Sequence, residues 1–303
     1  GSFKNEKYLH LNNFEPTSPK FDKVWEDIQK LYYNGVTVMV MLGGAGGAYK
    51  NLFSDFDEYY LLLKDFLKSK NFITGIDLDI EEGVAMEDVK KLINRLKSDF
   101  GSDFGITMAP VASSLITDGP GSFGNFSYKD LYNSDEGKFI EWFNVQCYGC
   151  YNFDTYDKII KNNYPSDKIE FGMISGDFVD NFEVALTEVK KVLSKYKDMS
   201  GVFNWEYIDS PPNKTDSSEW VKKMRIISGQ LKGKKILEPN DNNTRPLKDL
   251  TKESIFNIIK HSNKFKINFE NSEVLDLFSG TGSFGIECIS RGAKFVTFVE
   301  NYK

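Results

Sequence analysis

The sequence predicts an α/β protein, and three features of its 303 residues support this fold class. Short apolar runs, many of them rich in β-branched residues, alternate with longer amphipathic stretches along residues 8–209. There are seven such runs, and each has the length of a typical strand. A further strand, glycine loop, helix and strand follow one another along residues 274–299. Repeated βα units of this kind form parallel sheets or barrels rather than antiparallel sandwiches.

Predicted strands and helices alternate throughout the first part. The strands are Tyr8–Leu11, Val36–Leu42, Ile76–Ile80, Gly105–Ala109, Phe143–Tyr148, Ile169–Ile174 and Val202–Trp205. Between them, apolar residues recur at a spacing of three to four, which predicts amphipathic helices. The helices are Phe21–Tyr33, Phe56–Ser69, Met86–Asp99, Tyr156–Asn163 and Asn181–Lys197. Seven strands are one short of a (β/α)8 TIM barrel, and only Gly1–Lys7 precede the first. We therefore expect a barrel that lacks its first strand.

The composition changes near residue 210, which predicts a second unit. Pro211–Pro212 and a polar stretch are followed by a basic segment. From Lys223 onward the chain carries 14 Lys and Arg against 9 Asp and Glu, whereas the whole chain carries 38 against 44. An acidic part joined to a basic one indicates different partners, with nucleic acid a candidate for the second. We expect a barrel over residues 1–210, a linker over 211–223 and an incomplete α/β unit over 224–303.

Composition also bounds the class of protein and its compartment. With 40% hydrophobic and 27% charged residues the chain is typical of a globular protein, and no apolar run approaches the roughly 18 residues of a membrane span. The first residues show neither the basic nor the apolar region of an export signal. Three cysteines are too few for a disulfide framework. These features favour the cytoplasm and no membrane partner, with an N-terminus that reads as truncated.

Cys147 and Cys150 form a C-x-x-C pair. A structural zinc site takes about four ligands, yet the chain has two histidines and no second cysteine pair. We therefore interpret both cysteines as packing residues and predict no metal site.

The most informative segment is the acidic strand Thr74–Glu82. Because successive side chains of a strand alternate between its faces, Asp77, Asp79 and Glu81 share one face. Neighbouring carboxylates in a partly buried site raise one another's pKa, and this is how enzymes keep a carboxylic acid protonated near neutral pH. The segment therefore indicates a catalytic acid. A solvated strand end or a divalent-cation site is the alternative.

The same segment resembles the D-G-x-D-x-D-x-E signature of the family 18 glycoside hydrolases. Four further segments resemble strands of that family, in its order: Met41–Gly44, Thr107–Pro110, Gln146–Tyr148 and Gly201–Tyr207. The resemblance covers residues 8–209 and implies a TIM barrel that acts on glycans containing N-acetylglucosamine. Thr74 departs from the pattern, because the family has an acid there. In the family, that acid receives the rotating side chain of the residue that corresponds to Asp79. Its absence puts this movement of Asp79 in doubt and predicts weakened activity.

The resemblance implies a retaining, substrate-assisted hydrolase of chitinase or endo-β-N-acetylglucosaminidase type. Glu81 would be the general acid and base at the glycosidic oxygen. The sugar's own 2-acetamido carbonyl would attack the anomeric carbon, while Asp79, beside Asp77, orients the acetamido nitrogen. Tyr148 would hydrogen-bond the acetamido group. A barrel that only binds such sugars is the alternative, and the glycan stays open between chitin, peptidoglycan and an N-glycan core.

Further residues are implied in substrate binding. Gln146 would line the same wall, and Trp205 would form an apolar floor under the sugar ring. The glycine-rich segment that contains Gly43 and Gly44 could be a phosphate-binding loop, but it lacks the Lys-Ser/Thr that such a loop requires. We therefore predict a tight turn at the barrel mouth. Ordinary barrel filling is the alternative for Gln146, Trp205 and Tyr148. No cofactor is expected for the hydrolase.

The second part places a G-x-G-x-x-G loop between a strand and a helix. Asp276 precedes the loop, Gly280 and Gly282 lie in it, and Glu300 lies at the end of the following strand. This context predicts a Rossmann-like nucleotide site. The part resembles the N-terminal portion of the bacterial 16S rRNA guanine-N2 methyltransferases, on Met224–Gly229, Thr244–Pro246 and Lys252–Ile259, which implies S-adenosylmethionine as cofactor.

Two expectations temper that resemblance. The family's D/N-P-P-F/Y motif does not occur by Lys303, so we expect no methylation from this segment alone. The basic residues of its first stretch, residues 224–245, are Arg225, Lys232, Lys234, Lys235 and Arg245. They would either contact rRNA phosphates or be solvated side chains of a surface loop.

Overall fold

A computed structural model describes residues 1–4, 8–117, 123–178, 180–213, 215–224, 256, 269–270, 272–277 and 283–299. The chain divides into two compact units. The first comprises Gly1–Gln29 and Thr37–Met224, and the second comprises Lys30–Val36 with Arg225–Lys303. The predicted linker over 211–223 falls within the first unit, where the Trp220 indole hydrogen-bonds the Met173 sulfur at 3.3 Å. The boundary between two folding domains stays a prediction.

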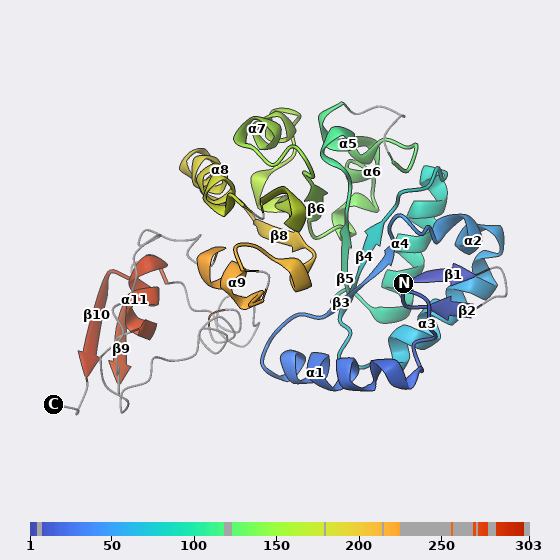
Figure 1. The fold of residues 1–303 in the computed structure, drawn as a ribbon, viewed down its shortest axis with the longest axis horizontal. Coiled ribbons are helices and arrows are strands. Elements are labelled where there is room, and N and C mark those ends of the chain that lie inside the picture. The colour runs from blue at the N-terminus through green and yellow to red at the C-terminus, as the bar shows by residue number, and fades with distance from the viewer. Residues whose placement is uncertain are drawn as a thin grey trace. The chain divides into compact units, whose positions relative to one another are not determined.

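A curled parallel sheet of six strands forms the centre of the first unit (Figure 1). In spatial order the strands are β3 (Met39–Gly43), β4 (Gly75–Asp79), β5 (Gly105–Met108), β6 (Phe143–Gln146), β7 (Ile169–Ile174) and β8 (Gly201–Trp205). Spatial order equals chain order, as expected of successive βα units. The predicted α/β class and barrel-like parallel sheet are confirmed.

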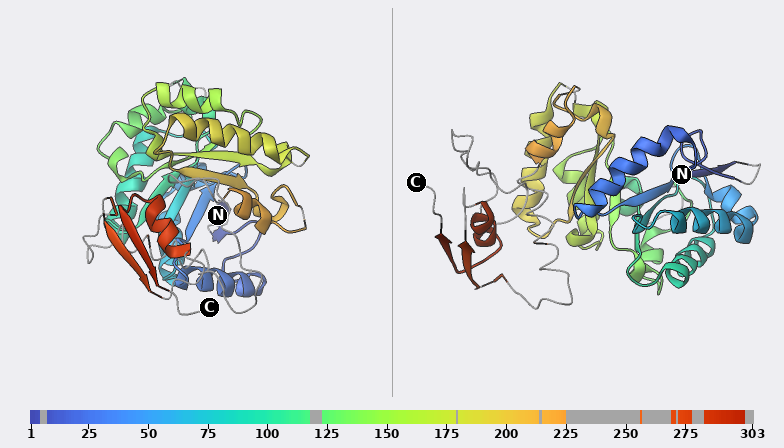
Figure 2. Two further views of the ribbon diagram at one scale, coloured as in Figure 1. Left: turned by 90° about the vertical axis from the view of Figure 1, so that its left-hand side faces the viewer. Right: turned by 90° about the horizontal axis from the view of Figure 1, so that it is seen from below.

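Helices connect the strands and lie outside the curl (Figures 1 and 2). They are α1 (Asp22–Tyr33), α2 (Tyr49–Ser54), α3 (Phe56–Ser69), α4 (Met86–Phe100), α5 (Ala112–Ile116), α6 (Tyr128–Tyr132), α7 (Phe153–Lys161) and α8 (Phe182–Lys195), followed by α9 (Ser218–Met224). Ile76 and Leu78 of β4 are fully buried, as are Leu63 of α3 and Leu92 of α4. This apolar layer between sheet and helices is the core, and it leaves the other sheet face for polar side chains.

The assignment of Tyr8–Leu11 to the parallel sheet is wrong. The run contains a strand, β2 (Tyr8–His10), but it pairs antiparallel with β1 (Ser2–Lys4) in a separate hairpin. The edge of β3 is instead met by Gly1, whose ammonium group donates to Met41 O and whose carbonyl accepts from Gly43 N at 2.9 Å. Among the described residues the parallel sheet therefore has six strands, not seven.

The described part of the second unit is a small βαβ element. Strands β9 (Glu273–Leu277) and β10 (Phe295–Val299) pair in parallel, and α11 (Ser283–Ser290) connects them. Phe256, Cys288 and Ala293 are buried together, with Val274 and Val296 packed against them. This strand, helix and strand order agrees with the sequence prediction, whose glycine loop lies outside the described residues.

Candidate active site

Acidic and amide side chains line the inner face of the curled sheet. Asp77 of β4 is in register with Met41 of β3 and Thr107 of β5, and Asp79 is in register with Gly43. In-register residues of neighbouring parallel strands point to the same side. Since Ile76 and Leu78 are buried in the layer between sheet and helices, the two aspartates face the opposite, concave side.

Asp77 is held by side chains of β5 and β6, the next two strands of the sheet. Its Oδ1 accepts hydrogen bonds from Thr107 Oγ1 at 2.6 Å and from Asn144 Nδ2 at 2.9 Å. The Asn144 Oδ1 in turn accepts from the Trp142 indole at 2.9 Å, which fixes the orientation of the amide. Burial raises the pKa of the Asp77 carboxyl, and the two hydrogen bonds lower it again in part.

Asp79 lies at the carboxyl end of β4 and is only 6% exposed. Its Oδ1 accepts from Gln146 Nε2 at 3.0 Å, and the same Nε2 donates to Ala109 O at 2.8 Å. Burial, and then the charges of Glu81 and Asp77, raise the pKa of the Asp79 carboxyl to about 7, against an ordinary value of 3.8. At neutral pH this group is therefore in exchange between its acid and its carboxylate.

Glu81 and Glu82 follow β4 and take different environments. Glu81 is partly buried and lies close enough to Asp79 and Tyr148 for its charge to raise the pKa of both. Glu82 turns to the first turn of α2, where it accepts from the backbone N–H groups of Ala48, Tyr49 (2.7 Å) and Lys50 (3.1 Å). A carboxylate in that position satisfies amide donors that a helix start leaves unpaired.

Tyr148 and Trp205 form an aromatic pair beside the acids. Their ring centroids are 6.3 Å apart with an interplanar angle of 28°. Trp205 ends β8 in register with Ile174 and is 51% exposed. Burial and the charge of Asp79 raise the pKa of the Tyr148 hydroxyl, which keeps it a hydrogen-bond donor at neutral pH.

The two glycines predicted at the barrel mouth are needed for close approach to Asp79. Gly43 has φ +102° and Gly44 has φ +82°, a region that side chains other than glycine rarely adopt. Gly44 N donates to the backbone carbonyl of Asp79 at 2.9 Å, and a Cβ at Gly43 would overlap that carbonyl oxygen. A Cβ at Gly44 would lie 3.4 Å from Asp79 Oδ2. The turn therefore packs directly against the carboxyl group.

Thr74, where the predicted signature lacks its acid, does not reach Asp79. It precedes β4, and its hydroxyl donates to Val38 O at 3.4 Å. Five residues of extended strand span about 16 Å. The acid that lies next along the inner face from Asp79 is Asp77, and its charge contributes to the raised pKa of Asp79.

Residues that the sequence reasoning missed also face this site. Thr107 and Asn144 bind Asp77, and strand alternation from Gln146 to Asn144 is a signal that points to the second of them. The buried hydroxyl of Tyr128 has no hydrogen-bond partner, and its pKa is raised first by burial and then by the charges of Asp79 and Asp77. Glu170 of β7 has a pKa raised to about 7, first by burial and then by the Asp77 charge.

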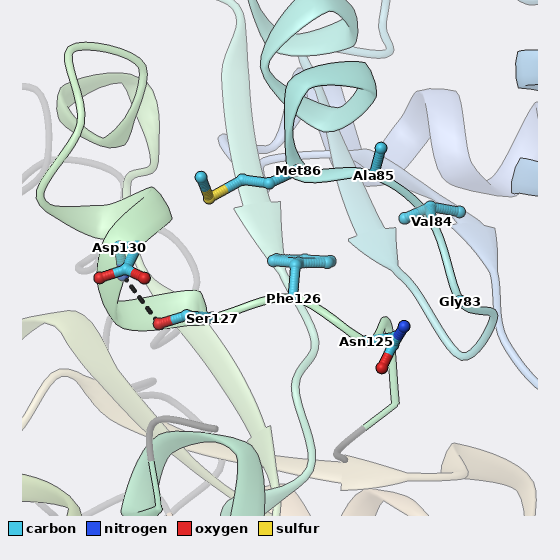
Figure 3. A pocket seen from close by; sticks show the side chains of 8 residues that line it. All are labelled: Gly83, Val84, Ala85, Met86, Asn125, Phe126, Ser127 and Asp130. Atoms are coloured by element: carbon cyan, nitrogen blue, oxygen red, sulfur yellow. Dashed lines mark hydrogen bonds between the residues drawn. The ribbon is translucent and has the colours of Figure 1, made fainter. Parts of the chain in front are cut away.

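A cavity of about 550 Å³ adjoins the segment that follows the acids (Figure 3). It is lined by Gly83, Val84, Ala85, Met86, Asn125, Phe126, Ser127 and Asp130. Val84 N donates to Gly124 O at 3.0 Å, and within the other wall Ser127 Oγ accepts from Asp130 N at 3.1 Å. None of the predicted site residues lines this cavity, although its first residue is two positions after Glu81.

The described residues contain no group of three or more His, Cys, Asp and Glu side chains placed to hold a metal ion. None of their helices is long and apolar enough to cross a membrane.

In the second unit, Asp276 is buried, and its Oδ2 accepts from Gly285 N of α11 at 2.9 Å. This bond ties the carboxyl end of β9 to the helix that follows the glycine loop. Gly280, Gly282 and Glu300 lie outside the described residues.

Comparison with solved structures identifies the first part. It is similar to a fungal endo-β-N-acetylglucosaminidase from glycosyl hydrolase family 18, with 31% identity and a TM-score of 0.66 over 73% of this chain and 82% of that one. The N-terminal part of the chain belongs to glycosyl hydrolase family 18. A second similar structure is that of the chitinase ChiC from Aspergillus fumigatus, with 29% identity and a TM-score of 0.63 over 72% of this chain and 82% of that one.

Curated relatives agree with the resemblance expected for both parts. Chitinase 2 of Rhizopus oligosporus is 26% identical over 212 residues, covering 60% of this chain and 36% of that protein.

Residues 224–303 match the family model described as conserved hypothetical protein 95. The rRNA methyltransferase-like protein YlbH of Bacillus subtilis is 43% identical over 77 residues, which are 25% of this chain. The ribosomal RNA small subunit methyltransferase D of Haemophilus influenzae is 42% identical over 77 residues, also 25% of this chain. The chain spans under two fifths of the length of each curated relative named here, namely 36% of the first, 39% of the second and 37% of the third.

Proposed function

We propose that the family 18 part hydrolyses β-linked glycans containing N-acetylglucosamine, with retention of configuration and with assistance from the substrate. The observation that carries this proposal is the Asp79 carboxyl, buried beside Glu81 at the carboxyl end of β4 with a pKa raised to about 7. Two carboxyl groups that interact this closely hold a proton available at neutral pH. Family membership supports glycan hydrolysis as its use.

Glu81 would donate the proton to the glycosidic oxygen. It is partly buried, and its side chain is not committed to a helix start, in contrast to Glu82. Loss of the leaving group develops positive charge at the anomeric carbon, and the acetamido carbonyl of the same sugar forms the new bond there. Glu81, now a carboxylate, would then take a proton from the water that opens this intermediate.

Asp79 would orient the acetamido nitrogen and stabilise the cationic intermediate. Gln146 holds its Oδ1, and the Gly43–Gly44 turn closes one side, so the carboxyl group has one well-defined position. A group that is correctly placed before the reaction loses little entropy in the transition state. The Asp77 network beneath it adds negative charge that favours a proton or a cation at Asp79.

Tyr148 would donate a hydrogen bond to the acetamido carbonyl and so direct its attack. Trp205 would stack its partly exposed ring on the sugar, because the apolar face of a pyranose matches an indole ring in shape. The stacked pair of Tyr148 and Trp205 provides both contacts from one side of the site. The partner is accordingly an oligosaccharide with at least one N-acetylglucosamine unit.

The test is hydrolysis of chromogenic N-acetylglucosamine oligomers by the full chain, alongside calorimetry with the unmodified oligomer. Turnover that disappears in Glu81→Gln, with binding retained, supports a hydrolase. Binding without turnover in the unmodified chain shows instead a barrel that only binds these sugars. If the unmodified chain shows neither binding nor turnover, the proposal is contradicted.

A second candidate function concerns residues 224–303, for which similarity to rRNA methyltransferases suggests S-adenosylmethionine binding. The described residues fit such a site, because the buried Asp276 fixes the strand end against the start of α11. Asp276, Gly280, Gly282 and Glu300 would hold the cofactor, whose methyl group is what a methyltransferase transfers. Basic residues of this part would contact rRNA. Calorimetry with S-adenosylmethionine tests the proposal, and a flat trace contradicts it.

A further inference from the structure

Two cysteines flank Tyr148 in a tight turn after β6. Cys150 N donates to Cys147 O at 3.0 Å, and Gly149 between them has φ +69°. The residues therefore form a hydrogen-bonded β-turn, whose first and last Cα atoms lie within about 7 Å. Disulfides join residues whose Cα atoms are about 4.4–6.8 Å apart. The backbone is thus close to the geometry that a bond between the two sulfur atoms needs.

The turn is anchored at both ends. Cys147 N donates to Gly172 O at 3.0 Å, and the ring of Tyr151 stacks on Phe171 with centroids 3.7 Å apart. Within the turn, Gly149 N donates to Asp177 Oδ2 at 2.6 Å. Such anchoring keeps the two thiols together instead of letting the loop separate them.

The two thiols differ in environment. Cys147 is fully buried, and burial raises its pKa. Cys150 is partly exposed, and a hydrogen bond from the Cys147 thiol lowers the pKa of Cys150 to about 7. A partly exposed thiolate beside a buried thiol is the usual arrangement of an attacking and a resolving cysteine. Both cysteines are free in this structure.

We propose that Cys147 and Cys150 form a reactive dithiol that small disulfides oxidise to an intramolecular disulfide across the turn carrying Tyr148. The Cys150 thiolate attacks the small disulfide, forms a mixed disulfide and releases one thiolate. Cys147 then loses its proton, attacks the Cys150 sulfur and releases the second thiolate. The protein gives up two protons and two electrons, and the small disulfide takes them up to become two thiols.

The disulfide would restrain Tyr148, which is one of the two residues enclosed by the ring. Tyr148 stacks on Trp205, and burial and then the charges of Asp79 and Glu81 raise the pKa of its hydroxyl. A change in the conformation of the turn would therefore alter the sugar-binding side of the site. This consequence rests on the proposed function, whereas the oxidation itself does not.

The experiment treats the full chain with oxidised glutathione, blocks remaining thiols with iodoacetamide and maps the peptides by mass spectrometry. The expected result is a Cys147–Cys150 peptide that is two hydrogens lighter and carries no alkyl group. In the reduced protein, Cys150 should react with limiting iodoacetamide about 5- to 10-fold faster than Cys288.

Two variants decide the assignment. Cys147→Ser should stop at a mixed disulfide on Cys150, and Cys150→Ser should stay reduced at Cys147. Full alkylation of both cysteines in the unmodified chain, or a mixed disulfide that persists on Cys150 there, would overturn the proposal. Where the reduced protein hydrolyses sugar oligomers, oxidation should lower the rate several-fold, and dithiothreitol should restore it. If the reduced protein has no activity, the proposed function fails, but the peptide map still shows whether Cys147 and Cys150 form a disulfide.

Discussion

The side-chain amide of Gln146 donates a 3.0 Å hydrogen bond to Oδ1 of Asp79, joining β6 to β4 across the end of the intervening strand β5. The bond is possible because β5 ends at Met108 and the next residue, Ala109, is small. Ala109 also accepts from the same Gln146 nitrogen. Three strands thereby fix the position of one carboxyl group, and several properties of the site depend on it.

Replacing Gln146 by alanine should raise the pKa of Asp79 above about 7. The lost hydrogen bond favours the charged carboxylate, so its removal favours the protonated form. The limb of the pH–rate profile that reports Asp79 should move to higher pH. Thr107→Val is the matched control, because Thr107 donates to Asp77 and not to Asp79. A profile unchanged in Gln146→Ala would show that Asp79 does not set the pH dependence.

The Asp79 carboxyl should lower stability at alkaline pH. Its pKa is about 7 in the folded protein and 3.8 ordinarily, so folding favours its protonated form. The resulting stabilisation is complete below pH 4 and is lost as the pH rises through 7. Asp79→Asn, which cannot ionise, should therefore melt a few degrees above the unmodified protein at pH 8, with a smaller difference at pH 5. An equal difference at both pH values would contradict this assignment.

Glu81→Gln and Glu82→Gln are adjacent, chemically identical changes with different expected effects. The first should lower the rate of hydrolysis by roughly 100-fold or more, as is usual on loss of a general acid. The second removes a charge from the start of α2 and should lower the free energy of unfolding by about 1 kcal/mol, with much less effect on the rate. Rates and urea unfolding curves of both variants measure this. Equal rate losses would mean that Glu81 is not the acid.

Gly43→Ala should destabilise the first unit by about 2 kcal/mol or more. The new Cβ would overlap the carbonyl oxygen of Asp79 and would occur at a positive φ. Gly46→Ala is the control, because a Cβ there has no neighbour within 4 Å. Thermal melts of the two variants test the prediction. Equal melting temperatures for Gly43→Ala and Gly46→Ala would contradict it.

Local patterns account for most of the correct predictions. Alternation along a strand depends only on the backbone of that strand, so the common face of Asp77 and Asp79 is readable from the chain. The same holds for the amphipathic helices α3, α4 and α8, whose apolar residues recur at helical spacing. The roles of Glu81, Tyr148 and Trp205 stay predictions that the experiments above address.

Contacts between distant segments were decided by the tertiary structure. Tyr8–Leu11 has the pattern of a strand, but which edge it joins depends on its partners, and Gly1 takes the place beside β3. Glu82 caps a helix that begins 33 residues earlier in the chain, at Tyr49.

By itself, then, the sequence determined the α/β class, the order of the strands and the acidic face of β4, because these follow from spacings within single segments. Only the tertiary structure decided that Asn144 and Thr107 hold Asp77 and that the Tyr128 hydroxyl is buried near the acids. The physical reason is that the register of neighbouring strands, the curvature of the sheet and the burial of a charge are properties of many packed segments together, and no one of these segments encodes them alone.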